Sequence, residues 1–312
     1  MTWHIGGRAE GKTILVTGAS AGIGYFVAEQ LAAGGATVVL GCRDAGRAEL
    51  AVRTIRRRVP DARLRWVHLD LADLSSLPAT VAALGVESLD AVVLNAGVML
   101  SGPDRRVTAR GHELMFATNH LGHFALTAHL EPLLTATANS RVITVGSFAA
   151  RSERLELADL QSEHDYRAKR SYGRSKLAQM LCGFELDRRL RARGAATASI
   201  VAHPGGALDS LTPSRPPLFV RTTSQRLRGL PAGVVVHGKD AGARCVVRAT
   251  VDTEIVSGQL WGPRIFGLRG EAHGETPRTH MTDPEAAAGL WSASVALTGL
   301  DPFPLPPKES RL

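Results

Sequence analysis

Short apolar segments alternate with segments of helical pattern from residue 13 to about residue 202. The strand-like segments are short and apolar without alternation, which is typical of strands that helices cover on both faces. They lie at residues 13–17, 37–40, 64–69, 91–94, 141–145 and 198–202. The helical segments lie at about residues 24–33, 45–59, 74–84, 111–137 (as a helix pair) and around Tyr172 to about residue 193. This alternation predicts an α/β fold with a doubly wound parallel sheet, a Rossmann fold.

The remaining residues predict a single domain that spans 1–312. Prolines interrupt residues 206–232, where we expect an irregular flap beside the functional site. A helix at about 241–250, a strand near 258–261 and a helix at 284–297 then close the domain. The proline-rich end, residues 301–312, predicts an extended arm.

Composition excludes several classes of protein. Lys and Arg number 37 against 29 Asp and Glu, but the excess is spread along the chain. The densest run, Arg56–Arg58, is interpreted as a solvated helix end, because no aromatic interleaving or nucleic-acid module accompanies it. The N-terminus lacks a signal-peptide pattern, and no apolar run approaches the roughly 18 residues of a membrane helix. Three scattered cysteines form no metal or disulfide spacing, which is typical of a protein from the reducing cytoplasm. Together these observations predict a soluble cytoplasmic protein without nucleic-acid or membrane partners.

Tyr172 and Lys176 are four residues apart within a helical segment, so they share one face of it. A cation near a phenol favours the phenolate and lowers its pKa. Such a tyrosine can exchange a proton with a carbonyl or an alcohol near neutral pH. The pair alone arises easily by chance. A catalytic role is supported by Ser147 after the fifth strand and by a glycine-rich turn upstream.

That turn, Thr17–Gly24, joins the first strand to the first helix. Gly18, Gly22 and Gly24 allow a tight turn and close approach of the backbone to a pyrophosphate, and the helix N-terminus attracts its charge. The spacing G-x-x-x-G-x-G differs from the common fingerprint G-x-G-x-x-G. Ser20 could add a hydroxyl to the phosphates.

The end of the second strand reads Leu40-Gly-Cys-Arg-Asp44. Enzymes for the non-phosphorylated cofactor usually carry an acid here that binds the ribose 2′-hydroxyl. This chain has Cys42 and then Arg43, whose guanidinium can pair with a 2′-phosphate, so the sequence favours NADP(H). Asp44 is interpreted as the cap of the next helix.

Asp70 and Leu71 follow the third strand, and Asn95, Ala96 and Gly97 follow the fourth. Ligands of open α/β sheets bind at these carboxyl ends. Ordinary loop chemistry is the alternative for both segments, with Asp as a helix cap and Asn-Gly as a turn.

Together these residues resemble the short-chain dehydrogenase/reductase family over roughly residues 11–206. Finer features are similar to its retinol dehydrogenase and protochlorophyllide reductase branch. The family motifs are Thr17–Gly24, Asp70, Asn95–Gly97, Asn119, Ser147, Tyr172-x-x-x-Lys176 and Pro204–Gly205. The branch features are Gly41–Asp44, Asn119–Phe124, Asp159–Ser162 and Leu290–Ser292.

The resemblance implies a catalytic set of Asn119, Ser147, Tyr172 and Lys176. Tyr172 would be the acid/base, Lys176 would lower its pKa and hold the nicotinamide ribose, and Ser147 would bind the substrate oxygen. Asn119 would hold a water that links the lysine to solvent. The cofactor would contact the remaining family positions, which are Gly18, Ser20, Gly22, Ile23, Gly24, Arg43, Asp70, Leu71, Asn95, Ala96, Gly97, Pro204 and Gly205.

Three departures from the family pattern concern substrate and cofactor contacts. Gly146 replaces a first serine, and 24 residues separate Ser147 from Tyr172, a longer interval than in most members. This insertion, residues 148–171, could shape substrate access or block a dimer contact. Asp209 stands where a threonine often meets the carboxamide.

The sequence therefore predicts an NADPH-dependent carbonyl reductase, reversible as an alcohol dehydrogenase. The alternatives are reduction of an activated C=C bond and a non-catalytic NADP(H)-binding sensor or scaffold. Apolar residues of the flap, such as Leu211 and Phe219, favour an apolar small-molecule substrate. Four histidines near Asn119 are interpreted as core or cap residues without a metal: His112, His120, His123 and His129. The sequence leaves open whether the protein forms a homodimer.

Overall fold

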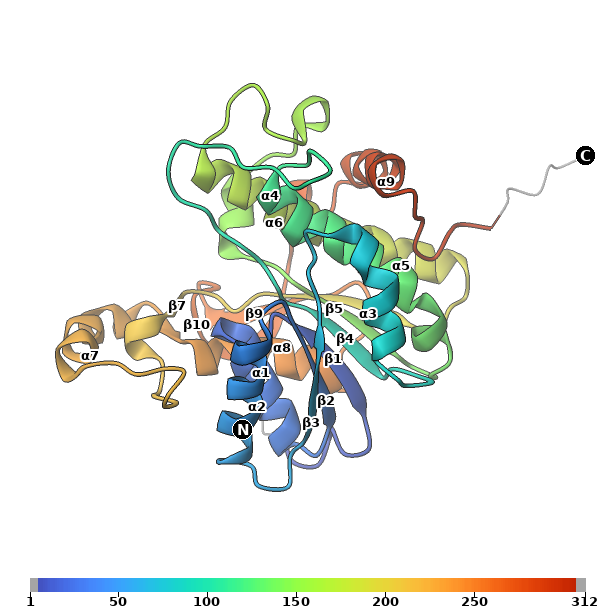
Figure 1. The fold of residues 1–312 in the computed structure, drawn as a ribbon. Coiled ribbons are helices and arrows are strands. Elements are labelled where there is room, and N and C mark those ends of the chain that lie inside the picture. Colours follow the sequence, from blue (N-terminus) through green and yellow to red (C-terminus); the bar gives the residue numbers. More distant parts are fainter. Residues whose placement is uncertain (1–4, 307–312) are drawn as a thin grey trace, which may run out of the picture.

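The computed structural model describes residues 5–306 and builds them around an eight-stranded sheet (Figure 1). The strand order is β10-β9-β6-β5-β4-β1-β2-β3, and every neighbouring pair is parallel except β9 and β10. This order confirms the predicted doubly wound sheet, whose connections reverse direction between β1 and β4. The bounds are β1 Thr13–Thr17, β2 Thr37–Cys42, β3 Arg63–His68, β4 Ala91–Leu94, β5 Arg141–Val145, β6 Ala198–Ala202, β9 Leu260–Ile265 and β10 Arg269–Glu275.

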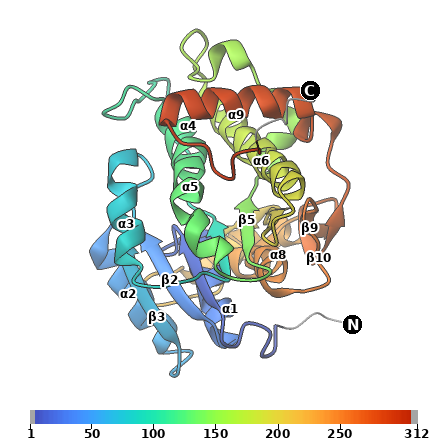
Figure 2. The same cartoon turned by 90° about the vertical axis from the view of Figure 1, so that its right-hand side faces the viewer.

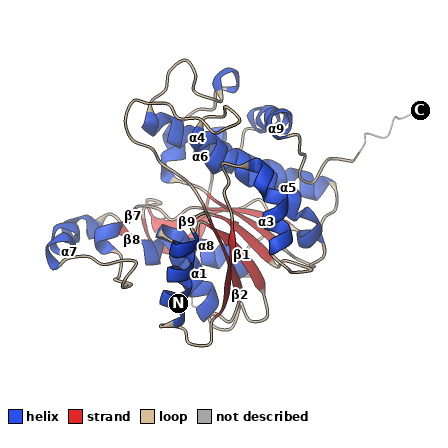
Figure 3. Ribbon diagram, viewed as in Figure 1, coloured by secondary structure: helices blue, strands red, loops and turns tan. Residues whose placement is uncertain are grey.

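Helices cover both faces of this sheet in two layers (Figure 3). One apolar core joins the sheet to α1, α2 and α8, and another joins it to α3, α5 and α6. Helix α9 packs against α6, farther from the sheet (Figure 2). The bounds are α1 Gly22–Ala33, α2 Ala45–Arg56, α3 Leu77–Ala83, α5 Gly122–Thr135, α6 Ala168–Ala192, α8 Lys239–Val251 and α9 Pro284–Thr298.

The helix pair predicted for residues 111–137 is wrong, because the segment forms one continuous helical run. It begins as α4 (Leu114–Phe116), passes through a π-helical turn, η2 (Ala117–Leu121), and continues as α5. A π-turn inserts one extra residue into a helix and is frequent at functional sites. Here the extra residue lies in the turn that contains Asn119.

The flap at residues 206–232 contains more regular structure than predicted. It includes the short helix α7 (Thr223–Gly229), which Thr222 caps through a reciprocal capping box with Gln225. Strands β7 (Ala207–Leu208) and β8 (His237–Gly238) pair in parallel at its base. In Figure 1 the flap projects from the body of the molecule.

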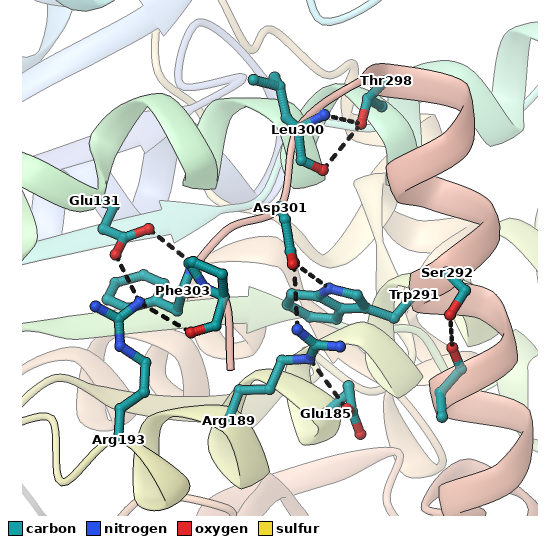
Figure 4. Close-up of polar contacts among 12 residues, drawn as sticks. Glu131, Glu185, Arg189, Arg193, Trp291, Ser292, Thr298, Leu300, Asp301 and Phe303 are labelled. Atoms are coloured by element: carbon teal, nitrogen blue, oxygen red, sulfur yellow. Dashed lines mark hydrogen bonds and ion pairs between the residues drawn. The ribbon is translucent and has the colours of Figure 1, made fainter. Parts of the chain in front are cut away.

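Residues 301–303, the first part of the predicted extended arm, are packed against the protein (Figure 4). Trp291 Nε1 donates to Asp301 Oδ1 at 2.7 Å, and Arg189 Nη1 donates to the same oxygen at 3.2 Å. The amide of Phe303 donates to Glu131 on α5, and its ring is completely buried. Residues 307–312 of the predicted arm lie outside the described residues.

Residues 1–4, which belong to the N-terminal segment interpreted as lacking a signal peptide, also lie outside the described part of the chain. Between residues 5 and 306, no helix is long and apolar enough to cross a membrane.

Candidate active site

A cleft opens where the carboxyl ends of β1, β4 and β5 meet. Its larger part has a cavity volume of about 410 Å³ and joins the glycine turn of β1 to the residues after β5 and to Tyr172 on α6. A second part of about 230 Å³ extends over the ends of β2 and β3. The two parts share five residues, so they form one continuous cleft: Gly18, Ala21, Ala96, Gly97 and Val98.

The glycine turn forms one wall of this cleft. Gly18 and Gly22 have φ angles of +67° and +58°, a region that side chains with a Cβ rarely adopt. A Cβ on Gly18 would lie 2.8 Å from the Cα of Ala96, so the two loops can approach only because this residue is glycine. No side chain caps the N-terminus of α1, which leaves backbone N–H groups for an anion.

Gly24 lies behind the cleft rather than in its lining. A Cβ there would meet the oxygen of Gly18 at 2.5 Å and the side chain of Asn95. Gly24 therefore permits close packing of α1 against the turn.

Two arginines border the part of the cleft over β2. Arg43 and Arg47 are exposed and line it together with Ser20. Asp44 Oδ1 accepts a hydrogen bond from the Arg47 amide at 2.8 Å, which confirms its interpretation as the cap of α2. Sequence reasoning missed Arg47, although its place one helical turn after Arg43 could have indicated it.

The loop after β4 is fixed by the end of β1. Asn95 Nδ2 donates to the Thr17 carbonyl at 2.8 Å, and the Thr17 hydroxyl accepts from the amides of Asn95 and Ala96 at 2.9 Å each. These bonds hold Ala96 and Gly97 at the lining of the cleft. Asp70 and Leu71 also line it, and Asp70 additionally accepts from the Ala72 amide.

Ser147, Tyr172 and Lys176 come together at the other end of the cleft. Ser147 follows β5 and begins a 3₁₀ turn, where its hydroxyl accepts from the Ala149 amide at 3.2 Å. Tyr172 and Lys176 lie on one face of α6, as their spacing predicts.

Lys176 is almost completely buried, with 4% of its surface exposed. Its Nζ donates to the Val145 carbonyl at 2.6 Å and to Gln179 Oε1. Burial lowers the pKa of this ammonium from 10.5 to about 7, because the charged form loses hydration.

Asn119 contributes its side chain to the architecture of the cleft. Its Oδ1 accepts from the Val98 amide at 2.7 Å, and its Nδ2 donates to the Val98 carbonyl and to the Ser175 hydroxyl. The side chain therefore ties the cleft loop to α6. The water-holding role implied for Asn119 stays a prediction.

Pro204 and Gly205 lie at the cleft on a turn that the buried side chain of His203 supports. His203 Nδ1 accepts from the Gly205 amide, and its Nε2 lies 3.2 Å from Glu275 Oε1. Nearby Asp209 pairs with Lys239 at 2.7 Å and with Arg221. Asp209 is therefore held by two cations, and Lys239, which sequence reasoning missed, lines the cleft instead.

Two of the four histidines near Asn119 are buried, as predicted for core residues. His120 bonds with the Ser294 hydroxyl and His123 with the Thr17 hydroxyl. Burial lowers both pKa values to about 3, so each ring is neutral. Across the described residues 5–306, no group of three or more His, Cys, Asp or Glu side chains could hold a metal ion.

The family model for short chain dehydrogenases matches residues 12–158. Human retinol dehydrogenase 13 is 34% identical over 294 residues, which cover 93% of this chain and 86% of that protein. Mouse polyprenol dehydrogenase is 37% identical over 298 residues, with 93% and 84% covered.

Solved structures are similar as well. A crystal structure of an uncharacterized protein from Mycobacterium paratuberculosis has a TM-score of 0.77 and 32% identity, and the match covers 98% of this chain and 100% of that chain. A short chain dehydrogenase from Escherichia coli, complexed with NADPH, has a TM-score of 0.52 and 25% identity, with 64% and 83% covered. With relatives of this similarity along nearly all of its length, the chain belongs to the short-chain dehydrogenase family, within its retinol dehydrogenase-like branch.

Proposed function

We propose that this oxidoreductase uses NADP(H) to interconvert a carbonyl and an alcohol on an apolar small molecule. One observation supports the proposal most strongly: a single cleft joins the glycine turn to Ser147, Tyr172 and Lys176. A nucleotide seated on the turn would extend toward the proton-transfer groups without crossing any packed side chain of the cleft.

The residues of the cleft fit a nicotinamide dinucleotide. The backbone at Gly22 is open to the cleft, since no atom lies within 4 Å of the place a Cβ would take, and the uncapped start of α1 suits a pyrophosphate. Arg43 and Arg47 favour a 2′-phosphate over a bare ribose hydroxyl, because both residues are exposed and line the cleft. Asp44 caps α2 with its carboxylate, which supports the same preference.

The proposed chemistry assigns one task to each polar side chain at the far end. A bound nicotinamide would supply or accept the hydride. In the reductive direction Tyr172 gives its hydroxyl proton to the carbonyl oxygen, and Ser147 donates a hydrogen bond to that oxygen as negative charge develops. Lys176 provides a nearby cation that stabilises the resulting phenolate.

Apolar side chains around the substrate end favour an apolar substrate. Met99 lines the cleft and is 69% exposed, and Phe148 beside Ser147 is 38% exposed. Phe266, in the turn between β9 and β10, is 84% exposed. The names of the two curated relatives, which refer to retinol and polyprenol, support the same substrate class.

Replacement of Tyr172 by phenylalanine tests the proposed acid. We expect Tyr172→Phe to lose at least roughly a hundredfold in turnover, because general acid–base catalysis typically contributes 10²–10⁴-fold. NADPH affinity, measured by fluorescence titration, should change little. Tyr166→Phe would be a poor control, because the Tyr166 hydroxyl is buried. Phe148→Leu, which alters the exposed ring next to Ser147 in the chain, serves as the control for substrate contacts.

A Tyr172→Phe variant that turns over a ketone at the wild-type rate would refute the assignment. Product analysis with matched ketones and enones separates carbonyl reduction from C=C reduction. Binding of NADPH without oxidation by any substrate would favour a sensor.

A further inference from the structure

A chain of buried polar side chains extends behind Lys176, away from the cleft. It passes from Lys176 to Gln179 on α6, to His123 on α5 and to Thr17 at the end of β1. All four side chains are at most 4% exposed. Buried polar groups of this kind hold one another in fixed orientations when each finds a partner.

The ammonium of Lys176 has three N–H donors and no acceptor. Two donors are directed to the Val145 carbonyl and to Gln179 Oε1, both of which lie behind the cleft lining. Because Lys176 also lines the cleft, the third donor is the one left for it. Gln179 therefore helps to determine where the ammonium points.

Gln179 is held from its other end. Its Nε2 donates to the Leu94 carbonyl at 2.9 Å and lies 3.0 Å from His123 Nδ1. These two contacts leave Oε1 facing Lys176, because a flipped amide would place its oxygen against the Leu94 carbonyl.

His123 links this arrangement to the cofactor end of the cleft. Its Nε2 lies 3.0 Å from the Thr17 hydroxyl, which accepts from the amides of Asn95 and Ala96. Its Nδ1 lies 3.0 Å from both Gln179 Nε2 and the Asn119 carbonyl, and it accepts from Gln179 in the tautomer whose proton is on Nε2. The titratable groups that face Lys176 are Tyr172 on its own helix and His123 on α5, and His123 is neutral. From β4 and β5 only backbone carbonyls enter this chain of contacts.

We propose that Gln179 is a positioning residue that aims Lys176 into the cleft, and that His123 holds Gln179 in register with the loop after β4. The inference rests on the proposed function, since the orientation of the Lys176 ammonium affects turnover only if Lys176 assists Tyr172. Gln179 acts through Lys176 and touches neither substrate nor cofactor.

The first experiment replaces Gln179 with methionine, which has similar volume but no acceptor. A hydrogen bond to a charged group contributes enough for a roughly tenfold to hundredfold loss in kcat/KM with NADPH and a ketone at pH 7. The alkaline limb of the pH profile should move to lower pH, because an ammonium that loses a partner gives up its proton more easily. Ser294→Ala removes a buried hydroxyl from the outer side of the same helix layer and should shift neither quantity.

A second pair of variants tests the role of His123 and protects against misfolding. Gln179→Asn shortens the side chain by one methylene and should give a smaller loss of the same kind. The double variant His123→Phe with Gln179→Met should lose less than the sum of the losses of the two single variants, because part of the effect of His123 passes through Gln179. Fully additive losses would overturn the role of His123.

A third measurement does not depend on turnover. Acylation of Lys176 by a small reagent, followed across pH by mass spectrometry of its peptide, reports the proton affinity of this lysine. In Gln179→Met the midpoint should fall by roughly one to two pH units. An unchanged midpoint together with a kcat/KM within twofold of wild type would overturn the proposal. If the wild type reduces no carbonyl, the proposed function fails, and the midpoint still decides whether Gln179 holds Lys176.

Discussion

Lys176→Met should remove activity and change the free energy of unfolding by an amount that depends on pH. Burial lowers the pKa of Lys176 from 10.5 to about 7, which means that the folded state binds this proton far more weakly than the unfolded chain does. At about 1.4 kcal/mol for each pH unit, the penalty amounts to about 5 kcal/mol at and below pH 7. Methionine fills a similar volume and carries no charge.

The sign of the pH dependence follows from the same pKa values. Between about pH 7 and 10.5 the unfolded chain keeps a proton that the folded protein has released, so the free energy of unfolding of the wild type rises with pH in this window. The free energy of unfolding of Lys176→Met does not show this rise, because methionine has no proton to release. Its advantage is therefore largest at and below pH 7 and shrinks by about 1.4 kcal/mol for each pH unit above that.

A second contribution does not depend on pH. It lowers the free energy of unfolding of Lys176→Met by the same amount at every pH. The substitution leaves the Val145 carbonyl and Gln179 Oε1 without their donor, and each unpaired buried group costs about 1–3 kcal/mol. At pH 7 the variant is then expected to lie between about 1 kcal/mol less stable and about 3 kcal/mol more stable than the wild type.

Urea unfolding at intervals between pH 6 and 9.5, followed by circular dichroism, measures the difference. Lys169, which is exposed in the first turn of the same helix, provides the control Lys169→Met. That control should follow the wild type at every pH. A constant difference between Lys176→Met and wild type from pH 7 to 9.5 would refute the reasoning, because titrations elsewhere in the chain cancel in the comparison.

Two further predictions concern the cofactor and the tail. Arg43→Ala and Arg47→Ala should each weaken NADPH binding roughly tenfold or more, by loss of a charge-assisted hydrogen bond, and leave NADH affinity nearly unchanged; calorimetric titration of both cofactors checks this. Equal losses for the two cofactors would contradict a 2′-phosphate contact. Phe303→Ala should lower the free energy of unfolding by about 3–5 kcal/mol because the ring is completely buried, whereas the exposed Phe266→Ala should lower it by less than about 0.5 kcal/mol in the same urea titration.

The parallel strands and most helices could be predicted because their patterns are local. β1 and β4 are continuous apolar runs, and α6 carries its pair at helical spacing. β10, in contrast, reads Arg269-Gly-Glu-Ala-His-Gly-Glu275 and has no apolar run. This strand forms because it pairs with the free edge of β9, and no local sequence pattern reveals that pairing.

The cleft was predictable where the chemistry lies in contiguous motifs. The glycine turn, Asn95–Gly97 and the Tyr172–Lys176 pair all line it. The contact between Gln179 and His123 was not, because it joins residues 56 positions apart on two different helices. The π-helical turn was also hidden, since one additional residue in a helix does not disturb an apolar pattern visibly.

The packed tail determines which surfaces this molecule can share with another copy of itself. Residues 301–303 already lie against both α5 and α6. A second copy of the protein that bound this surface would first have to displace Phe303 and expose Trp291. Self-association through this part of α5 and α6 would therefore compete with residues 301–303 for the same surface.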